Sequence, residues 1–278
     1  MSARAVFRLM LWLLPMWLLC AEPATAATRA LVIAADYVGA EKNLHLANAI
    51  VDGRLIAAAL SRAGVADIQS LEEANAEAWQ EGLAAFLSRL RKEDVALVYY
   101  AGHGLQVGGR NYFLAADGVS LLAIDAIVQQ IADRAGASII IIDACRNNPF
   151  QSADSGQSVL QVEEMKTGGS RALATIAMSA LRDGAAGLAQ LGELRGMSTV
   201  ALFSTEPGNV AFDGEPGRGS FFACAVAVEL ARRQSLNAAF RRIVTSVNRE
   251  TDGQQSPWRQ GDLPRDVFLA GMPHFPVP

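Results

Sequence analysis

The sequence is poor in cysteine and histidine and has no excess of basic residues. Its 278 residues include three cysteines and three histidines, and the formal net charge is -4. Three cysteines are too few for a disulfide framework, and the lack of clustered Lys and Arg disfavours a dominant role in nucleic-acid binding. The sequence also lacks a G-x-S-x-G elbow, a P-loop and a dinucleotide fingerprint. With 51% hydrophobic residues, the composition excludes a disordered or collagen-like chain and suits one large α/β domain or two small ones.

Residues 1–26 have the pattern of a secretory signal peptide. Two arginines precede the apolar run 9–20, and residues 24–26 (ATA) supply small side chains at the spacing of a cleavage site. The apolar run is shorter than the roughly 20 residues that a membrane span needs, which disfavours a membrane anchor. A lipoprotein signal ending at Cys20 is an alternative. We expect cleavage after Ala26, export to the periplasm or the medium, and no stable membrane span in the mature chain.

The rest of the sequence alternates strand-like and helix-like segments. Four short apolar runs are typical of strands buried on both faces: 30–35, 95–101, 138–144 and 199–204. Helical spacing marks five segments: 47–63, 75–91 with Asn75 as the N-cap, 123–135, 220–233 and 236–250. Residues 105–114 indicate a β-hairpin around two glycines, and 267–270 a short last strand. This alternation predicts an α/β fold, with a mostly parallel sheet of about six strands flanked by helices on both faces.

Two of the predicted strands end in residues that can carry out nucleophilic catalysis. His103 stands between two glycines after the strand 95–101, and Cys145 directly follows the strand 138–144. If these parallel strands are neighbours, both side chains emerge at one sheet edge, as a thiol nucleophile and its base require. Each residue taken alone could instead be structural. A zinc site is disfavoured, because the His and Cys residues show no paired ligand spacing.

The motifs at these strand ends resemble those of the caspase-like cysteine peptidases, the clan of caspases, metacaspases and paracaspases. Residues 99–104 (YYAGHG) resemble the histidine motif of the family, and residues 143–150 (DACRNNPF) resemble its cysteine motif in bacterial members. Residues 30–37 (ALVIAADY) resemble the opening strand of the catalytic subunit, and residues 203–208 (FSTEPG) the start of the small subunit. The resemblance implies a three-layer caspase-hemoglobinase-like fold over most of the chain.

The same resemblance implies hydrolysis of peptide bonds, in peptide or protein substrates, through an acyl-enzyme. Cys145 would be the nucleophile and His103 the general base and then the acid, while the backbone N–H groups of Gly104 and Cys145 would form the oxyanion hole. No metal ion or organic cofactor would take part in the chemistry, although some metacaspases depend on calcium. Two alternatives are a catalytically silent caspase-like module that binds peptides or partners, and another Cys-His hydrolase such as an amidase.

Three aspartates are predicted to set the substrate specificity. In caspases, a Gln before the Ala-Cys pair and two arginines bind an aspartate side chain at P1. Here Asp143 stands in place of that Gln, and Asp52 and Asp213 correspond to the arginine positions. Metacaspases and paracaspases are similar in having acidic residues there, and they cleave after Arg or Lys, because an acidic pocket pairs with a basic side chain. The structural alternatives are a helix-start role for Asp52 and a strand-end hydrogen-bonding role for Asp143.

Residues 151–196 are rich in Gly, Ser, Ala and Gln and predict a long loop with one helical stretch near 159–166. In caspase relatives this junction is often cut, so we expect self-processing within it, with an uncut insertion as the alternative. The candidate positions are Lys166, Arg171, Arg182 and Arg195, of which Lys166 and Arg171 are preferred. One catalytic domain would span 27–271, with a tail at 272–278.

Three further side chains receive structural interpretations. Cys224 lies in a strongly apolar helical segment, which favours a buried core thiol. A disulfide between Cys224 and Cys145 is conceivable outside the cytoplasm but is disfavoured by their different contexts. Tyr99 and Tyr100 are interpreted as packing residues.

Overall fold

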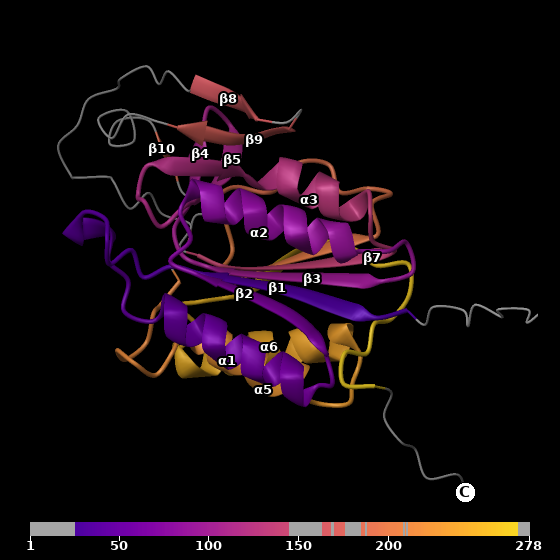
Figure 1. The fold of residues 1–278 in the computed structure, drawn as a ribbon. Helices are drawn as coiled ribbons and strands as arrows, with labels where there is room; N and C mark the ends of the chain where they lie inside the picture. Colours follow the sequence, from indigo (N-terminus) through magenta and orange to yellow (C-terminus); the bar gives the residue numbers. More distant parts are fainter. Residues whose placement is uncertain are drawn as a thin grey trace, which may run out of the picture.

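The protein folds into three layers, with a central sheet between two layers of helices (Figure 1). The computed structural model describes residues 26–144, 163–167, 170–175, 185–186, 188–207, 209 and 211–271. Within these residues, no helix is both long enough and apolar enough to cross a membrane.

The central sheet has six strands in the order β12-β11-β7-β3-β1-β2. Their bounds are β1 Thr28–Ala34, β2 Asp67–Glu72, β3 Val95–Ala101, β7 Ala137–Asp143, β11 Thr199–Phe203 and β12 Trp258–Gly261. The strands β1, β2, β3, β7 and β11 pair in parallel, and β12 pairs antiparallel to β11. Helices cover both faces of the four inner strands, which explains why these strands have nearly uninterrupted apolar sequences. The predicted mostly parallel sheet of about six strands is confirmed.

Helices pack on both faces of this sheet. One face is covered by α1 Ala49–Arg62, α5 Phe221–Leu230 and α6 Leu236–Glu250, and the other by α2 Ala76–Arg89 and α3 Ile124–Ala132 (Figure 1). The predicted N-cap of α2 is confirmed, because the Asn75 side chain accepts a hydrogen bond from the Ala78 N–H at 2.9 Å. Two apolar clusters fill the space between the layers. Trp79 and Phe86 are fully buried in one, and Ile56 and Ile243 in the other.

A second six-stranded sheet begins immediately after His103, in the order β10-β4-β5-β6-β9-β8. Its strands are β4 Gly104–Val107, β5 Arg110–Leu114, β6 Ser120–Ala123, β8 Glu163–Thr167, β9 Ser170–Thr175 and β10 Ala185–Ala186. The predicted hairpin is β4–β5, and its two turn residues, Gly108 and Gly109, have φ angles of 55° and 79°. Positive φ at both positions is the geometry that favours glycine in a two-residue hairpin turn.

Two parts of the predicted pattern are wrong. The segment 151–196 is not one continuous loop, since β8, β9 and β10 lie within it, and residues 163–166 of the predicted helical stretch belong to a strand. The last strand is β12 rather than 267–270. Val267 is buried in the core beside α6, where its carbonyl accepts a hydrogen bond from the Leu236 N–H at 2.8 Å, so its apolar character reflects packing and not strand pairing.

Candidate active site

The ends of β3 and β7 lie side by side at the carboxyl edge of the central sheet. The two strands pair in register up to Ala101 and Asp143, and the Gly102 N–H donates to the Asp143 carbonyl at 3.2 Å. His103 follows this last contact directly. Cys145 lies outside the described residues, two positions after Asp143 in the sequence. The structure therefore brings the His103 segment beside the strand that leads into Cys145, and the dyad itself stays a prediction.

The His103 ring is held in a buried position by one backbone carbonyl. The side chain is 8% exposed, its Nε2 lies 2.8 Å from the Leu44 carbonyl oxygen, and the Tyr37 ring packs on it at 4.7 Å between centroids. Because a carbonyl can only accept, this contact requires a proton on Nε2 and leaves Nδ1 of the neutral ring free to accept one. Burial lowers the pKa of His103, and the hydrogen bond to Leu44 opposes this shift. The buried environment therefore favours the neutral form of the ring, in which Nδ1 can accept a proton.

Two tyrosines fix the backbone on either side of this ring. The Tyr37 hydroxyl accepts from the His103 N–H at 2.8 Å, and the Tyr100 hydroxyl donates to the His103 carbonyl at 2.7 Å. The two hydroxyls also contact each other at 2.9 Å. A Cβ on Gly102 would stand 2.6 Å from the Tyr100 oxygen, so this arrangement excludes any side chain there. Tyr100 packs in the core as expected, but its hydroxyl and that of Tyr37 position the histidine, which sequence reasoning missed.

We expect Tyr37→Phe to weaken both the fold and the activity. The variant leaves the buried His103 N–H without its partner, at a cost of about 1–3 kcal/mol in the free energy of unfolding. Displacement of the ring should lower kcat/KM by about tenfold. Urea unfolding and peptide hydrolysis measure the two effects, and a variant with unchanged stability and unchanged kcat/KM would show that the tyrosine does not position His103.

Asp52 and Asp143 are linked through one serine. Asp52 is in the first turn of α1 and 3% exposed, and Asp143 at the end of β7 is 8% exposed. The Ser220 N–H donates to Asp52 Oδ1 and its hydroxyl to Asp143 Oδ2, both at 2.7 Å. The Tyr99 hydroxyl donates to the same Asp143 oxygen at 3.0 Å. The two carboxyls thus come together although they lie far apart in the sequence, and neither Ser220 nor Tyr99 was predicted to hold them.

These carboxyls, Asp213 and His103 line a single cavity. Its volume is about 20 Å³, enough for about one water molecule, and Gly102 and Ala144 also line it. Asp213 is exposed at its edge, and the loop that carries it is held by the buried Asn48 side chain, which donates to the Asp213 carbonyl at 2.6 Å. The structure therefore groups all three predicted specificity residues around His103. A long substrate side chain requires this cavity to open.

The environment of the three carboxyls disfavours their ionised forms. Burial raises the pKa of Asp52, and the neighbouring Asp143 raises it further. Burial likewise raises the pKa of Asp143. Partial desolvation and the neighbouring Asp36 raise the pKa of the more exposed Asp213. No Lys or Arg of the described residues forms an ion pair with any of the three. A cation that enters the cavity would therefore meet carboxyl groups that no described Lys or Arg pairs with, and its charge would favour their ionised forms.

The raised pKa values predict how stability depends on pH. The folded protein holds the protons of Asp52 and Asp143 more tightly than the unfolded chain, so these groups lower the free energy of unfolding as pH rises from about 4 upward. Asp143→Asn removes one ionisation, and we expect a smaller loss of stability between about pH 5 and pH 8 than in the wild type. Urea titrations at both values measure the difference, and an equal loss in both proteins would contradict the assignment.

The remaining predicted positions differ in their placement. Gly104 is buried in β4, and a Cβ there would lie 2.4 Å from the Leu188 side chain, so that position tolerates only glycine without rearrangement. Lys166 and Arg171 belong to paired strands, β8 and β9, while Arg182 lies outside the described residues. Arg195 is in a turn, with 91% of its side chain exposed. In the described part of the chain, no group of three or more His, Cys, Asp or Glu is arranged to hold a metal ion.

The prediction that Cys224 is a buried core thiol is wrong. Its side chain is exposed and carries a free thiol, which contacts the Arg218 carbonyl at 3.4 Å. The helix α5 is apolar on nearly all sides, so the sequence pattern does not indicate which side faces the core. Phe222 and Val226 face inward, whereas Cys224 and Val228, one turn apart, face outward. The partner in the conceivable disulfide, Cys145, lies outside the described residues.

Comparisons with known proteins agree with this architecture. The structure is similar to caspase-1 from Spodoptera frugiperda, with a TM-score of 0.60 and 14% identity over 89% of this chain and 91% of that one. It is also similar to a protein from Geobacter sulfurreducens, with a TM-score of 0.61 and 17% identity over 89% and 98% of the two chains. No curated protein sequence gives a significant match.

At the level of sequence, the match is to a family model rather than to an individual protein. The family model of the caspase domain matches residues 27–268, which include the His103 motif, the three aspartates and both sheets. The similar folds come from proteins of low sequence identity and therefore support the architecture alone. The match of the family model over residues 27–268 shows that this chain belongs to the caspase domain family.

Proposed function

We propose that the protein is a cysteine endopeptidase that cleaves after Arg or Lys. The observation that carries this proposal is the position of His103. It leaves the carboxyl end of β3 beside the strand that leads into Cys145, and its Nε2 is bound to the Leu44 carbonyl. The nitrogen left to accept a proton is Nδ1, which is what an imidazole needs to take the proton of a thiol nucleophile.

The reaction then proceeds in two steps. His103 takes the proton from the Cys145 thiol, the sulfur attacks the peptide carbonyl carbon, and the N–H groups of Gly104 and Cys145 stabilise the oxyanion. The C–N bond breaks as His103 returns the proton to the leaving amine, which leaves a thioester. In the second step His103 takes a proton from water, the hydroxide attacks the thioester, and the C–S bond breaks. His103 then returns its proton to the departing sulfur, and the acid product loses its proton to solvent to become a carboxylate.

The three aspartates support a basic P1 side chain. A guanidinium or ammonium group in this cavity would pair with carboxyls that no described Lys or Arg neutralises, and its charge would lower their raised pKa values. An aspartate at P1 would instead add a further negative charge to the cluster. Ser220 donates hydrogen bonds to both Asp52 and Asp143. A P1 side chain that binds these carboxyls therefore has to widen the cavity beside Ser220.

A peptide library that varies only at P1 tests this function directly. The purified protein should hydrolyse the Arg and Lys members, and a thiol-reactive peptide with Arg at P1 should label Cys145. Labelling without turnover would indicate a silent peptide-binding module. Turnover of simple amides with no turnover of peptides would indicate an amidase.

We also propose that the protein is exported and that residues 1–26 are removed as a signal peptide. Ala26 is exposed, and Ala27 is the first of the described residues that hydrogen-bonds to the folded domain, which supports cleavage after Ala26.

We propose that self-processing occurs between molecules and at Arg195, rather than at Lys166 or Arg171, the positions that the sequence favoured. The strands β3 and β11 both pair in parallel with β7, so Arg195, which precedes β11, lies at the opposite end of the sheet from His103, roughly 20 Å away along the strands. Lys166 and Arg171 are in paired strands and would first have to be released. We expect intact-mass spectrometry to show a cut after Arg195 whose rate rises with protein concentration and which is absent in Arg195→Gln. A rate independent of concentration, or the same cut in Cys145→Ala, would reject this pathway.

A further inference from the structure

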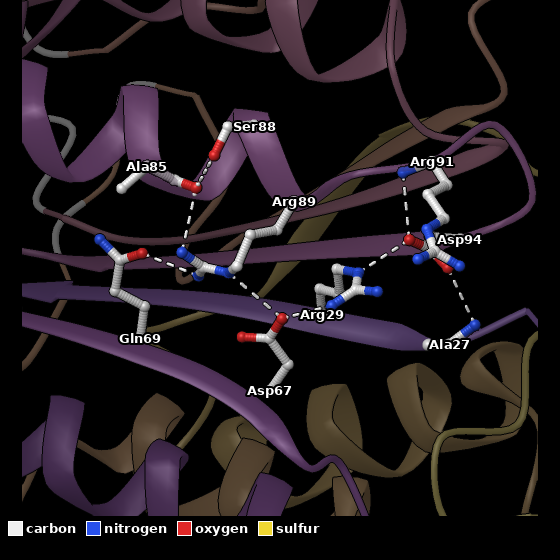
Figure 2. A network of polar contacts seen from close by, with 9 residues as sticks. All are labelled: Ala27, Arg29, Asp67, Gln69, Ala85, Ser88, Arg89, Arg91 and Asp94. Atoms are coloured by element: carbon white, nitrogen blue, oxygen red, sulfur yellow. Dashed lines mark hydrogen bonds and ion pairs between the residues drawn. The ribbon is translucent and has the colours of Figure 1, made fainter.

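The carboxylate of Asp94 is the centre of a small polar site at the amino end of the central sheet (Figure 2). Asp94 precedes β3, whereas His103 follows the opposite end of that strand. Asp94 is 1% exposed and lies in the turn before β3. Its Oδ2 accepts from Arg29 Nε at 2.8 Å and from the Arg91 N–H at 3.1 Å. Its Oδ1 accepts from the Ala27 N–H at 3.0 Å, the single hydrogen bond at that oxygen among the described residues.

This carboxylate is ionised in the folded protein. Burial would raise its pKa, but the hydrogen bonds from Arg29, Ala27 and Arg91 outweigh burial and hold the pKa below its usual value. The positive charge of Arg29 is shared between two carboxylates, because Arg29 pairs with Asp67 as well as with Asp94. Asp67 also contacts Arg89 Nε at 3.2 Å (Figure 2). One oxygen of a buried carboxylate therefore faces the backbone nitrogen of Ala27.

Among the described residues, the hydrogen bonds that join the N-terminal segment to the sheet begin at Ala27. The Val95 N–H donates to the Ala27 carbonyl at 2.9 Å, beside the Thr28–Val95 pair that begins the β1–β3 ladder, while Ala26 is exposed. Cleavage after Ala26 would convert the Ala27 amide into an α-ammonium group. In the uncleaved chain, the neutral Ala27 N–H lies 3.0 Å from Asp94 Oδ1. After cleavage, the same nitrogen would carry a full positive charge.

We propose that Asp94 is a binding site for the α-ammonium group created by removal of residues 1–26, so that processing after Ala26 locks the new N-terminus into the sheet. The inference rests on the proposed export and is independent of the proposed peptidase activity. Charged groups around the site come from every element that meets there: Arg29 on β1, Asp67 on β2, Arg89 on α2, and Arg91 and Asp94 on the turn before β3. The start of β7 contributes only the Gly136 and Ala137 backbone N–H groups, which donate to the Asp94 carbonyl.

The pH dependence follows from this ion pair. An α-amino group has an ordinary pKa of about 7.7–8.0, and the neighbouring carboxylate raises it in the folded protein. The added stability is therefore fully present below about pH 7.7 and is lost as pH rises through the higher folded value. Blocking the amine should abolish the effect without a steric penalty, because an acetyl group occupies the space that Ala26 fills in the uncleaved chain.

The test uses the full precursor, exported and processed by a bacterial host, in the Cys145→Ala background so that peptidase activity cannot intervene. Mass spectrometry should identify Ala27 as the first residue. Selective Nα-acetylation should lower the Tm by about 2–4 °C at pH 7 and have no effect near pH 10. The same acetylation of Asp94→Asn should have no effect at either pH, and one glycine inserted between Ala26 and Ala27 should mimic acetylation in the wild type.

Four results would overturn the proposal: a first residue other than Ala27, an unprocessed chain, no Tm change on acetylation at pH 7, or an equal change in Asp94→Asn. If Asp94→Asn does not fold, the pKa of the Ala27 amine, measured by NMR in the processed protein, decides instead. A value above about 8.5 supports the ion pair, and an ordinary value rejects it. Failure of the P1 library assay on the wild type would leave each of these measurements unchanged, so the two proposals fail separately.

Discussion

Replacing Cys145 with Ala is expected to lower peptidase kcat by about 10⁴-fold or more and to leave the fold intact. Without the sulfur no thioester can form, and the oxyanion hole and substrate binding alone leave only a small residual rate. His103→Ala should cause a similar loss, because the thiol then lacks the base that the Leu44 carbonyl orients. Stopped and continuous assays with an Arg peptide measure kcat, and circular dichroism checks the fold.

Cys224→Ala is the matched control for this experiment. It removes the exposed free thiol of α5, which lies outside the cavity that His103 lines. We expect Cys224→Ala to retain full activity and to keep labelling by the peptide inhibitor, whereas Cys145→Ala should lose both. Turnover that persists in pure Cys145→Ala, or that disappears in Cys224→Ala, would sink the proposed mechanism.

Replacing Asp143 with Asn should lower kcat/KM for Arg substrates by at least about tenfold, equivalent to about 1.4 kcal/mol of transition-state binding. The amide can still accept hydrogen bonds from Ser220 and Tyr99, so the substitution removes charge and retains the local contacts. Asp52→Asn should act in the same direction, because both carboxyls face one cavity.

Citrulline at P1 provides a sharp control, because it matches the shape of arginine and has no charge. The wild type should prefer Arg to citrulline by at least about tenfold, and the Asn variants should lose most of that preference. Asp133 is an exposed carboxyl just past α3, and the control variant Asp133→Asn should retain the preference for Arg over citrulline. Equal cleavage of both substrates by the wild type, or a preference for Asp at P1, would refute the acidic pocket.

Local sequence was sufficient to predict the inner strands and the helices. The strands β1, β3, β7 and β11 are covered by helices on both faces, so their sequences are almost wholly apolar, and such runs are recognisable without knowing their partners. The histidine motif was equally visible, because two glycines beside a histidine at a strand end make an unusual pattern. The edge strand β2, in contrast, has the half-polar sequence DIQSLE and was not predicted.

Tertiary pairing decided the elements whose own residues are ambiguous. The polar sequence of β8 (EEMKT) becomes a strand because β9 pairs with it, and β9 in turn pairs with β6. The exposure of Cys224 depends on which side of an all-apolar helix meets the sheet, which no periodicity within α5 reveals. The strand conformation of β8 and the exposure of Cys224 therefore depend on contacts with residues that are distant in the sequence.

The same division holds at the site. Sequence motifs pointed to His103, Cys145 and the three aspartates as separate residues, and the in-register pairing of β3 with β7 places the His103 segment beside the strand leading into Cys145. Only the folded chain joins Asp52 to Asp143 through Ser220, which lies 168 and 77 residues away from them. A hydrogen bond depends on distance and direction in space, and those are set by the packing of α1 and α5 on the sheet rather than by any spacing along the chain.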